Sequence, residues 1–324
     1  MTYKIENLLN KNKWFENPTF ISGPPKSGTT LLMNLLDGHD ELITMPFEPA
    51  FPEMLYFKKY FKNTTQIYWD WVLNTPYLLH LTQEYAKHNQ IEIIKAIDII
   101  SNDVKISRTL IKKLSKEKEL NLKKDIGIDF PVLNYLDDFK KLIDLYKRKD
   151  EKEFIFLNLI SLKKNTLYKN KKIKGRIFKA PSLHPFDTRA IDNFMKLFTR
   201  GKIIIITRDS RGFFLSLRKQ IYDKKRNQEG FKSSIWSYFR ELNILEETYN
   251  ELMTNKILKK PNFISIKYEE LVLHPKKTIN YLCKFLEVKF NNIFLLPTTF
   301  KKSVHVITAN SKKKNIIFKD SLDK

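Results

Sequence analysis

The chain has 324 residues, of which 42% are hydrophobic, and its 59 lysine and arginine residues against 36 acidic residues give a formal net charge of +23. This length suffices for a sizeable α/β core, and we expect residues 1–324 to form a single domain. The single cysteine, Cys283, excludes an internal disulfide, and no apolar stretch is long enough to span a membrane. The N-terminus lacks a signal-peptide core, so we expect a cytoplasmic protein.

Residues 19–32 read TFISGPPKSGTTLL, which predicts a short apolar strand, a tight loop and the beginning of a helix. Backbone N–H groups of such a loop and the N-terminus of the helix bind phosphate-like anions, and Gly23 and Gly28 allow the ligand to approach the backbone. A Walker A loop reads GxxxxGKS or GxxxxGKT, whereas here Thr29 follows the second glycine and Lys26 precedes it by two positions. The displaced lysine argues against an ordinary nucleoside triphosphatase.

The segment after this helix reads DGHDEL over residues 37–42, and we interpret His39 as a capping residue of the turn at Gly38. Residues 63–174 then alternate helix-like and lysine-rich stretches without a recognisable motif. We expect this part to be a helical insertion that forms a lid and an acceptor wall. Elsewhere, short apolar strands alternate with amphipathic helices, which predicts a parallel sheet flanked by helices.

Four consecutive isoleucines at 203–206 predict a strand that is buried on both faces, as in a parallel sheet. Arg208 follows this strand, and Ser216 comes eight residues later on the expected helix. A guanidinium and a hydroxyl can together hold a phosphate monoester. The strand ends in Thr207 and Arg208, where a P-loop kinase would usually place a magnesium-binding acid.

A last strand and helix are predicted from FISIKYEELVLHP at residues 263–275, where the proline favours the first turn of a helix. The following residues Ile279, Leu282, Phe285 and Leu286 form one apolar stripe, which indicates core packing. Cys283 lies on the same stretch, and we expect it to be a buried, unreactive thiol.

These segments resemble the sulfotransferases that use 3′-phosphoadenosine 5′-phosphosulfate (PAPS). Residues 25–30 match the PKSGTT signature of the family's 5′-phosphosulfate loop, and Arg208 and Ser216 match its 3′-phosphate site. Residues 268–275 resemble the YEELVxHP segment of the tyrosylprotein sulfotransferases and their bacterial glycan-type relatives. The resemblance implies a P-loop-like α/β fold and the transfer of a sulfuryl group from PAPS to an acceptor hydroxyl, without a metal.

The resemblance also implies the site residues. For cofactor binding these are Lys26, Ser27, Gly28, Thr29, Thr30, Arg208, Ser216, Tyr268, Ser311 and Lys324. Lys26 and Lys179 would stabilise the charge that develops during transfer. Glu48, downstream of the DGHPEL-like segment, is the expected general base, and His184, which is similar to the histidine of the cytosolic small-molecule branch, is the alternative.

The acceptor and the oligomeric state stay open at this point. A carbohydrate is favoured, because Tyr68, Trp69 and Trp71 could stack on a sugar face. The rival interpretations are a P-loop kinase, a non-catalytic nucleotide-binding module and a nucleic-acid-binding protein that uses the positive charge. No helix-turn-helix, zinc-binding or RNA-recognition signature supports the last of these.

Overall fold

The computed structural model describes residues 5–24, 26–44, 85–92, 95–96, 99, 138, 141–142, 145, 151–165, 172–179, 194–196, 198–212, 215–216, 243, 260–299 and 302–303. The helices and strands with defined bounds are α1 (Ile5–Lys11), η1 (Lys13–Glu16), β1 (Pro18–Ser22), α2 (Thr29–Asp37), β2 (Leu42–Thr44), α10 (Glu151–Lys164), β3 (Gly175–Lys179), β4 (Lys202–Thr207), β5 (Phe263–Lys267), α14 (Tyr268–Leu273), α15 (Pro275–Leu286), η5 (Asn292–Leu295), β6 (Thr298–Thr299) and β7 (Lys302–Ser303). None of these helices is long and apolar enough to cross a membrane.

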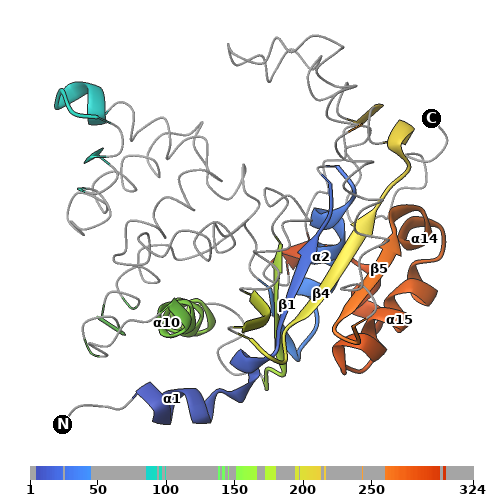
Figure 1. Cartoon of the computed structure of the whole chain (residues 1–324), viewed down its shortest axis with the longest axis horizontal. Coiled ribbons are helices and arrows are strands. Elements are labelled where there is room, and N and C mark those ends of the chain that lie inside the picture. Colours follow the sequence, from blue (N-terminus) through green and yellow to red (C-terminus); the bar gives the residue numbers. More distant parts are fainter. Residues whose placement is uncertain are drawn as a thin grey trace.

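Five strands form one sheet in the order β2-β3-β1-β4-β5, with β1 at its centre (Figure 1). Every neighbouring pair is parallel, and Phe20 of β1 is in register with Phe178 of β3 and with Ile203 of β4. A short antiparallel pair, β6 and β7, lies apart from this sheet. The predicted parallel α/β sheet is therefore confirmed.

The internal strands are buried on both faces. All five residues of β1 are buried, and so are the four isoleucines of β4 at 203–206. A strand in this position cannot present a polar face to solvent, which explains its nearly continuous apolar sequence. The strand predicted at 203–206 has the expected burial.

Helices α2, α14 and α15 cover one face of the sheet. Leu32 and Leu36 of α2, Leu271 of α14 and Ile279 and Leu282 of α15 pack with alternate strand residues in one apolar cluster. In Figure 1, α14 and α15 lie beside β5, drawn in orange.

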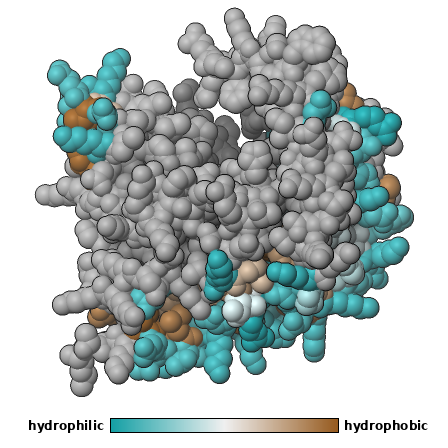
Figure 2. Space-filling model, in the orientation of Figure 1, coloured by the Kyte–Doolittle hydropathy of each residue, from teal (hydrophilic) through white to brown (hydrophobic). Residues whose placement is uncertain are grey.

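The outer face of α15 carries exposed lysines. In Figure 2 the described residues along the right-hand side of the molecule, where Figure 1 shows α14 and α15, are mainly hydrophilic. Lys276, Lys277 and Lys284 are exposed, whereas Leu286 and Cys283 face inward. Burial raises the pKa of the Cys283 thiol to about 11, so the thiol stays protonated at neutral pH. The predictions of a buried, unreactive cysteine and of an apolar stripe on this helix are confirmed.

The other face of the sheet is built around aromatic rings and one buried cation. Phe15 of η1 packs edge-on against Phe156 of α10, with 4.8 Å between ring centroids. Arg176 of β3 is fully buried, and its guanidinium carbon lies 3.6 Å from the Phe15 ring centroid and 4.6 Å from that of Phe198. Burial holds the pKa of Arg176 well below its usual value. Aromatic faces partly replace the water that this cation has lost.

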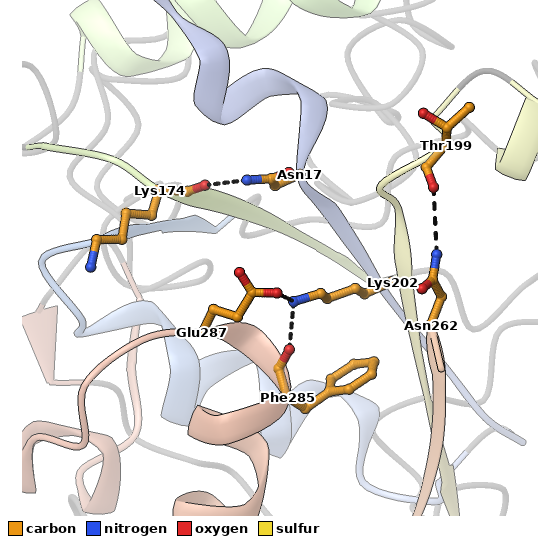
Figure 3. Close-up of polar contacts among 7 residues, drawn as sticks. All are labelled: Asn17, Lys174, Thr199, Lys202, Asn262, Phe285 and Glu287. Carbon is orange, nitrogen blue, oxygen red and sulfur yellow. Dashed lines mark hydrogen bonds and ion pairs between the residues drawn. The ribbon is translucent and has the colours of Figure 1, made fainter. Parts of the chain in front are cut away.

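Side chains close the amino edge of the sheet (Figure 3). Asn17 donates to the Lys174 carbonyl at 3.2 Å, which joins the beginnings of β1 and β3. Lys202, the first residue of β4, donates to the Phe285 carbonyl at 2.6 Å and forms an ion pair with Glu287 at the same distance. These contacts hold the first residues of β1, β3 and β4 in place. The motifs predicted to bind ligand lie at the opposite edge of the sheet, where the strands end.

Candidate functional site

The candidate site lies where β1, β4 and β5 end side by side. The loop of residues 23–28 follows β1, Arg208 follows β4, and Tyr268 follows β5. In the strand order, β2 and β3 lie on one side of β1, and the chain reaches β2 from β1 through α2. β4 and β5 lie on the other side of β1. The space between β1 and β4 is therefore the topological switch point, where open α/β sheets bind their ligands.

The loop of residues 23–28 has an unusual backbone. Lys26 has φ of 66° and Gly28 has φ of 101°, both in the left-handed region. For a lysine this conformation is uncommon, and such outliers persist where surrounding contacts hold them. The N–H of Ser27 donates to the Pro24 carbonyl at 3.1 Å, which closes a turn around the outlier.

Two glycines allow this loop to pack on its neighbours. A Cβ atom at Gly23 would lie 2.3 Å from the Ile206 carbonyl oxygen of β4. A Cβ atom at Gly28 would lie 2.4 Å from Cδ2 of Tyr268. The left-handed Gly28 is also the residue from which α2 begins at Thr29. The N-terminus of α2 is thus directed at the site, where its dipole and amide groups favour an anion.

Arg208 connects the end of β4 to the loop. Its Nη1 donates to the main-chain carbonyl of Lys26 at 3.0 Å. Its guanidinium carbon lies 4.4 Å from the centroid of the Tyr268 ring, within cation–π range. Because Gly28 packs against the same ring, Tyr268 is buried between the loop and the arginine.

The residues after Arg208 are held by two further contacts. The N–H of Asp209 donates to Oε1 of Glu269 at 3.0 Å. The Asp209 carboxylate accepts from Nε of Arg211 at 3.0 Å and from Nη2 at 2.9 Å. This hydrogen bonding lowers the pKa of Asp209 to about 2, so the carboxylate is ionised at neutral pH and its charge is balanced by Arg211.

The other predicted cofactor-binding residues lie nearby in the chain and differ in exposure. Ser27 is fully buried, and its Oγ has no hydrogen-bond partner among the described residues. Thr29 is buried in the first turn of α2, Thr30 of the same turn is exposed, and Ser216 is half-buried on the helical segment after Arg208. The structure therefore joins Lys26, Gly28, Arg208 and Tyr268 in one set of contacts.

Four predicted site residues, Glu48, His184, Ser311 and Lys324, lie outside the described residues, as do Tyr68, Trp69 and Trp71. Most of the expected insertion at 63–174 is outside as well, apart from α10 and a few shorter segments. The backbone of Lys179 is described: it ends β3 in register with Ile21 of β1. Lys179 therefore leaves the sheet at the same carboxyl edge as the loop.

The turn after α2 is a second polar cluster, at the other end of this helix. Asp37 is 1% exposed, and its carboxylate accepts hydrogen bonds from Oγ1 of Thr44 and, at 2.8 Å, from Oγ1 of Thr298. These bonds join the ends of α2 and β2 to β6. We call Asp37, Thr44 and Thr298, together with His39, the anchor cluster.

The ring of His39 makes other contacts in this turn than the helix cap predicted for it. Its Nδ1 accepts from the N–H of Glu41 at 3.1 Å, so Nε2 carries the hydrogen and donates to the Lys289 carbonyl at 2.9 Å. The ring is stacked on Phe294, with 4.5 Å between centroids. The histidine thus binds a chain segment 250 residues away in sequence.

Sequence reasoning missed the roles of Asp37 and Glu269. Both belong to motifs that the sequence displays, DGHDEL and YEEL. Their partners, Thr298 and the N–H of Asp209, lie far away along the chain. The available signal was an acid in a motif next to a strand end, but the partner of each acid depends on the tertiary packing of distant segments.

The described part of the chain is thus a parallel α/β sheet with a set of cationic and amide groups at its carboxyl edge. The cationic groups of the described site come from Lys26 and Arg208, and the amide donors come from α2. The carboxylates of Asp209 and Glu269 accept hydrogen bonds within the protein. Such a donor set suits phosphate or sulfate groups.

Comparison with known proteins gives the family. The model of the sulfotransferase family matches residues 18–292, which include all five strands of the large sheet. This chain belongs to the sulfotransferase family. Enzymes of this family generally use PAPS as the sulfuryl donor.

The individual relatives share low sequence identity with this chain. Protein-tyrosine sulfotransferase 1 of Danio rerio is 28% identical over 111 residues, which are 34% of this chain and 30% of that protein. The match thus spans less than a third of the relative's length. Among solved structures, the sulfotransferase domain from the curacin biosynthetic pathway is 17% identical, with a TM-score of 0.48 over 94% of this chain and 88% of that one. The sulfotransferase from Alicyclobacillus acidocaldarius is 13% identical, with a TM-score of 0.41 over 89% of this chain and 86% of the other.

Proposed function

We propose that this enzyme transfers the sulfuryl group of PAPS to a hydroxyl acceptor, with the donor bound at the carboxyl edge between β1 and β4. The observation that carries the proposal is the hydrogen bond from Arg208 Nη1 to the Lys26 carbonyl, 3.0 Å long. It joins the residue that matches the family's 3′-phosphate site to the loop that matches its 5′-phosphosulfate site. One nucleotide with phosphates at both positions can contact both residues.

The residues present fit PAPS. The loop supplies a tight turn, the N-terminus of α2 and the Lys26 ammonium for the 5′-phosphosulfate. The buried Oγ of Ser27 is a polar atom of the same loop without a protein partner in the described part of the chain. A guanidinium has five N–H donors and can bind a carbonyl and a phosphate at the same time, so Arg208 can hold the 3′-phosphate beside Ser216.

PAPS supplies a sulfuryl group on a phosphate leaving group. Lys26 and the N-terminus of α2 would stabilise the negative charge that develops on the leaving side. Lys179, at the end of β3 next to β1, would add a second cation. These residues act on charge that is larger in the transition state than in the ground state, which is the condition for a rate effect.

Glu48 is the proposed general base. It lies four residues after Thr44, the last residue of β2, and four extended residues span at most about 14 Å. Because β2 runs parallel to β3, the chain leaves β2 in the direction of the carboxyl edge where the loop lies. His184 is the alternative base, five residues after Lys179.

A carbohydrate hydroxyl is the proposed acceptor, because Tyr68, Trp69 and Trp71 supply aromatic faces on which a sugar ring can stack. The match to a protein-tyrosine sulfotransferase favours a tyrosine hydroxyl as the second candidate. A panel of oligosaccharides and tyrosine peptides, incubated with labelled PAPS, separates the two.

The decisive first experiment is calorimetry without magnesium, comparing adenosine 3′,5′-bisphosphate with ADP. These ligands differ mainly in where the second phosphate is attached. We expect a strong preference for the 3′,5′ compound, and we expect Arg208→Ala to abolish it because the guanidinium is the matched 3′-phosphate ligand.

Equal binding of the two nucleotides would contradict the proposal. An ADP preference that requires magnesium would favour a P-loop kinase instead. Binding of adenosine 3′,5′-bisphosphate without transfer to any acceptor would indicate a nucleotide-binding module.

A further inference from the structure

To bind the 3′-phosphate, the long and flexible side chain of Arg208 must point in one direction. The hydrogen bonds of the sheet do not determine this direction. The parallel pairing of β4 with β5 ends at Thr207 and Lys267. Arg208 and Asp209 therefore lie just beyond the last pair of the ladder. Their orientation depends on contacts that replace the ladder.

Two consecutive residues in the first turn of α14 make these contacts. The Tyr268 ring lies 4.4 Å from the Arg208 guanidinium carbon. Oε1 of Glu269 accepts the N–H of Asp209 at 3.0 Å, and this N–H belongs to the peptide bond that joins Asp209 to Arg208. The side chain of the arginine and the peptide that follows it are thus both fixed by the same helix turn.

We propose that Glu269 is a positioning residue for the 3′-phosphate of the nucleotide. By accepting the Asp209 N–H, its carboxylate fixes the peptide plane after Arg208 and with it the direction in which the guanidinium leaves β4. The bond from Arg208 to the Lys26 carbonyl then extends this orientation to the loop. This inference rests on the proposed function, since it assigns the 3′-phosphate to Arg208.

An acid in the first turn of a helix also stabilises the helix dipole, and this effect must be separated from positioning. Glu270 provides the control. It is the next residue in the same turn of α14, it carries the same charge, and its side chain is exposed. None of the hydrogen bonds among the described residues involves its carboxylate. Glu269→Ala and Glu270→Ala therefore remove the same charge, but only the first removes the acceptor of the Asp209 N–H.

The test measures the ratio of the affinities for adenosine 3′,5′-bisphosphate and ADP. We expect Glu269→Ala to reduce this ratio about tenfold, the scale of one charge-assisted hydrogen bond. Glu269→Gln keeps the ratio, because its amide oxygen still accepts the N–H, and Glu270→Ala leaves it unchanged. If Glu269→Ala does not fold, Glu269→Asp replaces it, since the shorter side chain withdraws the acceptor but keeps the charge.

A double variant tests whether Glu269 acts through Arg208. In an Arg208→Ala background, Glu269→Ala should change the ratio no further, because the positioned group is gone. Equal ratios for Glu269→Ala and Glu270→Ala would overturn the inference, and so would a loss in Glu269→Gln as large as in Glu269→Ala. If the wild-type enzyme itself shows no preference for the 3′,5′ compound, the proposed function fails instead, so the two failures are distinguishable.

Discussion

The two ends of helix α2 use polar residues in opposite ways. At its N-terminus, the loop of residues 23–28 presents amide donors and Lys26, and Arg208 binds the loop through one main-chain carbonyl. At its C-terminus, the carboxylate of Asp37 is 1% exposed and accepts two threonine hydroxyls. The first end suits an external anion, whereas the anchor cluster satisfies its hydrogen bonds within the protein.

This difference separates a binding role from a stabilising role in one helix. The buried carboxylate of Asp37 already accepts hydrogen bonds within the protein and is therefore not suited to bind a ligand. Removal of this carboxylate would leave the buried hydroxyls of Thr44 and Thr298 without this acceptor. A loop with a left-handed lysine and an outward dipole adds little to stability, but it is shaped for an anion. We therefore expect mutations at the N-terminal end to change turnover and mutations at the anchor cluster to change the free energy of unfolding.

The largest effect is expected for Glu48→Gln. The chain reaches Glu48 from Thr44 of the anchor cluster, and we expect turnover to fall about a hundred- to ten-thousandfold as general-base catalysis is lost. Binding of adenosine 3′,5′-bisphosphate should remain, because Glu48 is proposed to act on the acceptor hydroxyl and not to hold the nucleotide. The measurement is kcat with the best acceptor of the panel. If His184→Gln produces this loss and Glu48→Gln does not, the base is His184.

Lys26→Ala should reduce turnover by about a hundred- to a thousandfold, since it removes the ammonium group proposed to stabilise the leaving charge. The main-chain carbonyl that Arg208 binds is kept, so the free energy of unfolding should change by less than about 0.5 kcal/mol. Steady-state kinetics and urea unfolding check both parts. The exposed Lys276→Ala is the control for loss of one positive charge, and an equal effect there would show that Lys26 acts only through net charge.

Asp37→Ala should destabilise the protein by about 2–4 kcal/mol, because Thr44 and Thr298 lose a charged acceptor in a buried place. A lower urea midpoint at an unchanged m value would be the evidence. The neighbouring Asp40 is exposed, so Asp40→Ala should remain close to wild type. Loss of the 3′,5′ preference in a folded Asp37→Ala protein would break the division between the two ends.

The smallest effect concerns pH and Glu41, in the turn after α2. Burial raises the pKa of Glu41, but the hydrogen bond and charge of Lys174, 2.5 Å away, outweigh it and hold the pKa below its usual value of 4.5. A lowered pKa in the folded state means that the ion pair stabilises the protein above pH 4.5 and that this contribution disappears as the pH falls through the folded-state value. The contribution should be below about 1 kcal/mol, as for other partly exposed pairs.

Glu41→Gln should accordingly make the stability fall less steeply below pH 4.5, as measured by urea unfolding at a series of pH values. The exposed Glu6→Gln on α1 is the matched control. A wild-type slope in Glu41→Gln would show that the ion pair with Lys174 does not stabilise the fold.

The local features of the donor site could be predicted because they depend on residues close together in the sequence. The loop at 23–28 follows from its glycines and the strand before it, and the burial of β4 follows from four consecutive isoleucines. The apolar stripe of α15 follows from helical periodicity. Each of these inferences needs only the chemistry of neighbouring residues.

The sequence by itself thus determined the class of fold, the loop proposed to bind an anion and the buried strand that precedes Arg208. The tertiary structure decided that Arg208 binds the Lys26 carbonyl, that Glu269 holds the Asp209 N–H, and that Asp37 accepts the Thr298 hydroxyl. For the first two contacts the physical reason is strand order, since β1, β4 and β5 are neighbours only after the sheet has formed, whereas the third depends on the packing of β6 beside α2. Contacts between the ends of β1, β4 and β5 join residues that are up to 182 positions apart in sequence, as in the bond between Arg208 and Lys26.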